Sequence, residues 1–241
     1  MEPDSAWNTL FTWEPDQSLD SCSRVRTDGW PNRQGDEMTP HPIARWVGPL
    51  SLLAAALIII SQGLHLGIGL AMGAQPADTA LHSVKYVLAL LAMFALLLAL
   101  TGLYLRQAGA AGRLGMIGYL VAALGTLLVA GDWWFESFIM PRIADVAPEV
   151  MTGAITGSMV VGAAATFGLF AAGWIVFGVA TFRANVYPRP AAALLIIGGA
   201  VGILALSTPY QVPLAVAVGW IGYSLTRSRP AQETAPALQP A

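Results

Sequence analysis

The sequence predicts an all-α fold, an integral membrane bundle of six transmembrane helices. Of the 241 residues, 56% are hydrophobic and only 11% are charged, whereas soluble domains carry about 25% charged residues. The apolar residues also form successive long runs, and a helix needs about 20 predominantly apolar residues to cross a bilayer. We therefore expect a multi-pass protein of the cell membrane, with the lipid bilayer as its surroundings.

Each apolar run predicts one span, except the last. That run, residues 191–225, is too long for a single helix and is interrupted at 207–213 by two prolines and several polar residues. Because proline breaks the helical hydrogen-bond pattern, we expect two short spans of about 15 residues, joined by a tight turn at the membrane surface. The other predicted spans are residues 47–72, 86–105, 114–131 and 157–182.

The positive charges of the loops test this count, since Lys and Arg accumulate on the cytoplasmic side. With six spans and the amino terminus inside, the outer side holds only Lys85 and Arg142. A five-span arrangement would move Arg227 and Arg229 to the outer side. Both termini are therefore expected in the cytoplasm. The arginines placed inside are Arg45, Arg106, Arg113, Arg183, Arg189, Arg227 and Arg229.

The two ends of the chain differ from the transmembrane domain, which we expect at 41–226. Residues 1–40 hold eight acidic and three basic residues and are predicted to be a disordered acidic tail. Residues 227–241 are predicted to be a second disordered tail. An alternative for the first segment is that translation begins at Met38, which is followed by residues 39–46 and then by the first apolar run.

The composition also excludes several functional classes. Cys22 is the only cysteine and there are three histidines, too few for a structural zinc site with four Cys, or two Cys and two His, ligands. A formal net charge of −2 argues against nucleic acid as a partner. The phosphate-binding loop, nucleophile elbow and His-Glu-x-x-His motifs of soluble enzymes do not occur.

Ionisable residues inside a membrane are costly and indicate function. The first span carries His65, on the same face as Gln62, while the other candidates lie at the start of the second span and the end of the third. By the predicted topology all of them lie near the outer leaflet, and the last three spans contain no ionisable residue. The candidate polar site is His65, His82, Lys85, Asp132 and Glu136, with no residue assigned as catalytic.

Several interpretations of this site stay open. The two histidines with a carboxylate could ligate a metal, or the two histidines a haem. Alternatively, Asp132 or Glu136 could titrate opposite Lys85 in a proton-coupled or polar-substrate pocket. We favour a structural role, in which the carboxylates cap a helix at the headgroups and Lys85 extends to the surface. No metal is assigned and we expect no cofactor.

Two further features affect the surroundings of the site. Residues 138–152 are expected to form a surface helix between Ile139 and Val146, with a lid as the alternative, and Arg142 is expected to pair with Glu136. Glycines four apart let helices approach closely, and contact within one chain is favoured over a homo-oligomer seam. These pairs are Gly63 and Gly67, Gly69 and Gly73, Gly153 and Gly157, and Gly198 and Gly202.

Three segments resemble a broad group of uncharacterised small bacterial polytopic membrane proteins. They are Gly-Leu-Tyr-Leu-Arg-Gln at 102–107, Gly-Arg-Leu-Gly-Met-Ile-Gly at 112–118 and Phe-Glu-Ser-Phe-Ile-Met-Pro at 135–141. The resemblance covers roughly residues 47–226 and implies a six-helix bundle without a particular activity. The acidic tail departs from it.

The sequence thus indicates a non-enzymatic membrane protein that binds a small apolar ligand or a membrane-protein partner. The alternative is a small transporter or membrane oxidoreductase that uses the polar site near the outer leaflet.

Overall fold

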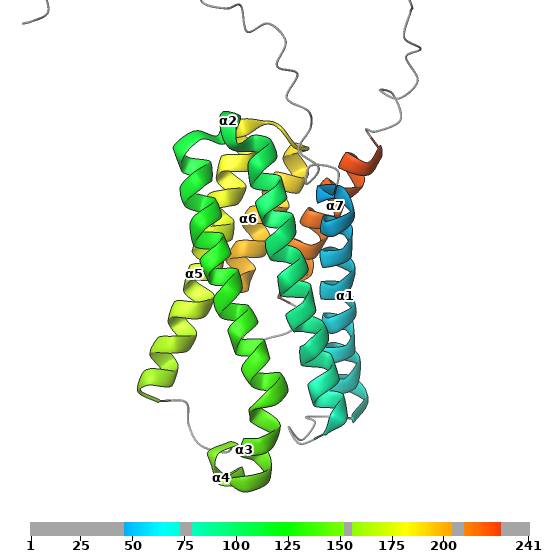
Figure 1. Cartoon of the computed structure of the whole chain (residues 1–241), viewed down its shortest axis with the longest axis vertical. Coiled ribbons are helices and arrows are strands. Elements are labelled where there is room, and N and C mark those ends of the chain that lie inside the picture. Colours follow the sequence, from blue (N-terminus) through cyan, green and yellow to red (C-terminus); the bar gives the residue numbers. More distant parts are fainter. Residues whose placement is uncertain (1–45, 73–78, 152–155, 204–209, 228–241) are drawn as a thin grey trace, which may run out of the picture. The chain divides into compact units, whose positions relative to one another are not determined.

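The structure is a computed structural model that describes residues 46–72, 79–151, 156–203 and 210–227. All belong to the compact unit Pro40–Ala241. They form helices and contain no strand, which confirms the all-α prediction; the acidic tail lies outside them, as does the carboxyl-terminal tail beyond Arg227. The helices are α1 (Val47–Met72), α2 (Ala80–Phe138), α3 (Met140–Val146), α4 (Pro148–Met151), α5 (Ser158–Ala184), α6 (Arg189–Gly202) and α7 (Val212–Arg227) (Figure 1).

Helix α2 is a hairpin of two helical arms, which contain the second and third predicted spans. The chain reverses at Gly112, whose φ of 55° and ψ of −149° lie in a region that only glycine adopts without strain. Residues 80–111 form the first arm and residues 113–138 the second, and the two run side by side in Figure 1. Both arms extend beyond the apolar runs, so the polar residues at their free ends are helical.

The long helices pack in a closed order. Helix α1 contacts α2 and α7, α5 contacts α2 and α6, and α6 contacts α7. The largest buried side chains come from one face of α5, where Phe170, Trp174 and Phe177 recur at helical spacing.

The second arm of α2 and α5 approach most closely, and we call this contact the α2–α5 seam. A Cβ atom added to Gly118, Gly125 or Gly173 would lie less than 3.0 Å from the backbone of the facing helix. Among the predicted glycine pairs, Gly198 and Gly202 also pack inside the chain, whereas an added Cβ at Gly63 or Gly67 meets nothing within 4 Å. The pairs 69/73 and 153/157 extend outside the described residues.

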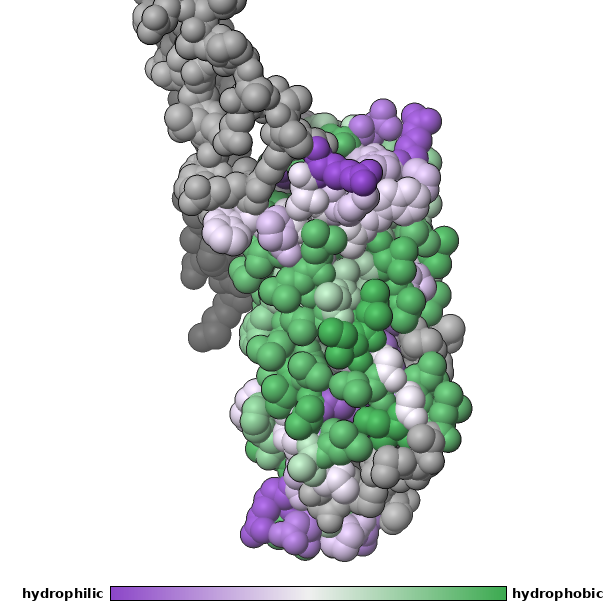
Figure 2. Space-filling view, turned by 90° about the vertical axis from the view of Figure 1, so that its right-hand side faces the viewer, coloured by the Kyte–Doolittle hydropathy of each residue, from purple (hydrophilic) through white to green (hydrophobic). Residues whose placement is uncertain are grey.

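Three helices are long and apolar enough to cross a membrane: α1 over Val47–Ile68, α2, and α5. Helix α6 has 14 residues and α7 has 16, so both are shorter. On the face shown in Figure 2, hydrophobic residues form a broad band with hydrophilic residues gathered at both ends. The chain is therefore an all-helical protein suited to membrane insertion.

The end of the segment between α6 and α7 is buried in the protein. Residues 204–209 lie outside the described residues, but Tyr210 is only 7% exposed and Gln211 is fully buried. Both side chains therefore pack inside the bundle, and the placement of the turn at the membrane surface stays a prediction.

Candidate polar site at the open end of the α2 hairpin

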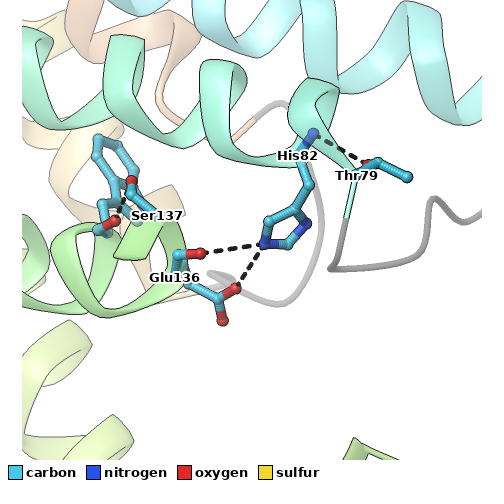
Figure 3. Close-up of polar contacts among 5 residues, drawn as sticks. Thr79, His82, Glu136 and Ser137 are labelled. Carbon is cyan, nitrogen blue, oxygen red and sulfur yellow. Dashed lines mark hydrogen bonds and ion pairs between the residues drawn. The ribbon is translucent and has the colours of Figure 1, made fainter. Parts of the chain in front are cut away.

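The open end of the hairpin is held by a contact between its two arms. His82 lies in the first turn of α2, where its backbone N–H donates to Thr79 Oγ1 at 3.3 Å. His82 Nε2 lies 3.2 Å from the Glu136 carbonyl oxygen and 3.4 Å from Glu136 Oε2 (Figure 3). Because both oxygens are acceptors, Nε2 carries a hydrogen and donates it. The arms are thus joined at residues 54 positions apart.

The predicted pairing of Arg142 with Glu136 is wrong. Arg142 Nη1 instead lies 2.5 Å from Asp145 Oδ2, an exposed pair within α3. The partners are three positions apart along one helix, a spacing that brings side chains together locally. The predicted helix between Ile139 and Val146 is confirmed as α3, Met140–Val146.

Tyr86 is the centre around which the basic candidates gather. The His82 ring lies 4.7 Å from the Tyr86 ring and the His65 ring of α1 lies 6.2 Å away, edge to face. Lys85 Nζ lies 4.7 Å from the centre of the Tyr86 ring, within the range of a cation–π interaction. His65, Lys85 and His82 are close enough to interact electrostatically.

A buried chain of amides reaches this region from α1 and from the start of α7. Gln62 Nε2 donates to Gln211 Oε1 at 3.3 Å, and Gln211 Nε2 donates to the Tyr210 hydroxyl at 3.4 Å. Gln62 Oε1 is buried and accepts no hydrogen bond within the described part of the chain.

The carboxylates complete the site from the second arm. Asp132 and Glu136 both interact electrostatically with Tyr86, and Glu136 also with Lys85. Among the described residues, neither Lys85 nor Asp132 has an ion-pair partner, although both are partly buried. We call the whole group the polar cluster: Gln62, His65, His82, Lys85, Tyr86, Asp132, Glu136, Tyr210 and Gln211.

The structure thus brings all five predicted site residues into one region. Sequence reasoning missed Tyr210 and Gln211, because they lie between the two prolines that indicated a surface turn. The available signal was a glutamine inside an apolar run, the same signal that had drawn attention to Gln62. Whether the cluster works as a site stays a prediction.

The metal alternative gains no support from the described residues. Within the described ranges, no three or more His, Cys, Asp or Glu side chains lie close enough together to hold an ion. The haem alternative gains no support either, since His82 Nε2 is engaged by Glu136.

Comparison with protein-family models, curated proteins and solved structures finds no match.

Proposed function

We propose that this chain is a six-span membrane protein that binds a small polar ligand in the polar cluster, without catalysing a reaction on it. The observation that carries the proposal is the pair Lys85 and Asp132, partly buried charges of opposite sign without ion-pair partners among the described residues. Such charges are costly in a low-dielectric region and are commonly retained for function. The cluster favours a polar ligand over the apolar one that composition suggests.

The proposed six spans are α1, the two arms of α2, α5, α6 and α7. At 1.5 Å per residue, α6 and α7 reach only about 21 and 24 Å, less than the roughly 30 Å hydrocarbon core. Non-helical backbone at membrane depth is tolerated where it is buried in protein or lines a cavity. The buried Tyr210 and Gln211 fit that condition, and broken helices of this kind supply binding groups in transporters.

The charged residues support an orientation with both termini in the cytoplasm. Among the described residues, the four acidic ones lie on the second arm of α2 and on α3 and α4, at the open end of the hairpin. The arginines other than Arg142 flank Gly112, flank the α5–α6 connection or end α7. Since cytoplasmic loops are rich in Arg, the polar cluster is then on the outer side.

Cysteine labelling tests this topology. In a Cys22→Ser background, Val150→Cys on α4 should react with a membrane-impermeant maleimide on intact cells. Arg113→Cys, beside the hairpin turn, should react only after the membrane is permeabilised. Labelling of both positions from the same side would refute the six-span arrangement.

Thermal unfolding of the purified protein tests the binding site. Asp132→Asn and Lys85→Met should leave the melting temperature unchanged or raise it, by about 2–4 °C if about 1 kcal/mol is gained. Asp145→Asn and Arg142→Met, which alter an exposed pair, are the matched controls. A clear fall for both cluster variants, but not for the controls, would mean that the cluster only supports packing.

A transporter is the second candidate, and the buried segment at Tyr210 and Gln211 favours it. Uptake of a bound ligand into proteoliposomes would separate transport from binding alone.

A further inference from the structure

We infer that the ligand of the polar cluster is a zwitterion, with an ammonium group that donates to Asp132 and Gln62 and an anionic group that faces Lys85. This inference rests on the proposed function and adds the chemical class of the ligand. It is argued from the groups that the cluster leaves without partners.

The acceptor side consists of two groups from different helices. Gln62 is 5% exposed, and its Oε1 accepts no hydrogen bond from the described part of the chain, although its Nε2 is used. The hydrogen-bonded chain from Gln62 leads through Gln211 to Tyr210. Asp132 lies one helical turn before Glu136, which contacts His82, and Tyr86 lies one turn after His82, so the antiparallel arms bring Asp132 to the level of Tyr86. A buried acceptor without a donor is unfavourable, so this side is completed by a group that brings N–H donors and a positive charge.

The donor side is Lys85. Its ammonium lies over the Tyr86 ring, a contact that leaves N–H groups available, since the ammonium has three. Glu136 interacts with Lys85 electrostatically, and its Oε2 lies 3.4 Å from His82 Nε2. Among the described residues, no carboxylate oxygen lies within 4.0 Å of Lys85 Nζ. A carboxylate or phosphate of the ligand would supply the missing anion.

A ligand with a single charge fits the acceptor side and the donor side together less well than a zwitterion does. A simple cation would be attracted by Asp132 but repelled by Lys85. A simple anion would be attracted by Lys85 but repelled by Asp132. A zwitterion pairs with both. Two sources offer this chemistry: a free amino acid, or the ethanolamine headgroup of a lipid. A choline headgroup has no N–H donor for Gln62 Oε1 and fits less well.

Melting of the full-length protein in phosphatidylcholine nanodiscs, followed by tryptophan fluorescence, tests the inference. The free probes are straight-chain ω-amino acids from glycine to 6-aminohexanoate, and their singly charged controls are butylamine and butanoate. Glycerophosphoethanolamine, and nanodiscs of phosphatidylethanolamine, represent the lipid source. Isothermal titration calorimetry then gives the affinity of the probe with the largest shift.

At least one zwitterionic probe should raise the melting temperature more than either singly charged control. Its affinity should fall about tenfold or more in both Asp132→Asn and Lys85→Gln, because each variant removes a charge-assisted contact. Arg142→Gln should bind like the wild type. A response to amino acids alone identifies a free solute, and a response to the ethanolamine probes identifies a lipid headgroup.

The inference is overturned if butylamine or butanoate binds as tightly as every zwitterion, or if no zwitterionic probe binds. It is also overturned if the affinity is unchanged in both variants. The proposed function is judged separately, by the melting temperatures of Asp132→Asn and Lys85→Met without any probe. If the site bound only cations, for example, the zwitterion inference would be refuted, but the proposed function of ligand binding would not be.

Discussion

The α2–α5 seam and the polar cluster both use the second arm of α2, but they are built in opposite ways. At the seam, glycines bring backbones into contact, and the polar pair Thr126 and Trp174 is hydrogen-bonded, with Trp174 Nε1 donating to Thr126 Oγ1 at 3.2 Å. At the cluster, Gln62 Oε1 accepts no hydrogen bond and Lys85 and Asp132 stay unpaired within the described residues. The polar pair at the seam is therefore satisfied, whereas the cluster contains polar groups without partners among the described residues.

The largest effect is expected at the seam. Gly125→Leu would force a side chain into the backbone of Phe170, and overpacking of this kind should cost about 3 kcal/mol or more. The yield of monodisperse protein in size-exclusion chromatography should collapse. Gly63→Leu is the matched control, because an added Cβ there meets nothing within 4 Å. Equal yields for both variants would mean that the close approach at Gly125 does not exist.

A smaller loss is expected for the hydrogen bond across the seam. Thr126→Val leaves the buried Trp174 N–H without its acceptor, which should lower the free energy of unfolding by about 2 kcal/mol. A double-mutant cycle with Trp174→Phe, measured by reversible denaturation, should show coupling between the two sites. Strictly additive losses would argue against this bond.

At the cluster, the contact between the hairpin arms should contribute less. His82→Ala removes the donor to both Glu136 oxygens and should lower the free energy of unfolding by about 1 kcal/mol. Glu136→Gln keeps the backbone carbonyl as an acceptor, so its loss should be smaller than that of His82→Ala. The reverse order in a thermal melt would show that the carboxylate, and not the carbonyl, holds the arms.

The smallest effect is expected at the exposed pair on α3. Arg142→Gln should change the free energy of unfolding by less than about 0.5 kcal/mol, since surface ion pairs contribute little. A melting temperature clearly below that of the wild type would mean that Arg142 has a second role in the folded chain.

Some features of the structure could be predicted from the sequence, and others could not. The apolar runs predicted α1 with its observed bounds, Val47–Met72, because hydropathy and helix length are local properties. The sequence also identified the five candidate residues of the polar site, since an ionisable residue within or beside a long apolar run is easily recognised. The pairing of Glu136 could not be found, because Arg142 is its neighbour along the chain, whereas His82 is 54 residues away.

The sequence by itself determined the helical class and the residues that are costly to place in a membrane, since both depend on the hydropathy of short segments. Only the tertiary structure decided which polar groups meet. The reversal at Gly112 joins His82 to Glu136, and the packing of α1 against α7 joins Gln62 to Gln211. The physical reason is that hydrogen bonds and ion pairs are short-ranged, so partners far apart in sequence are chosen by how the helices pack.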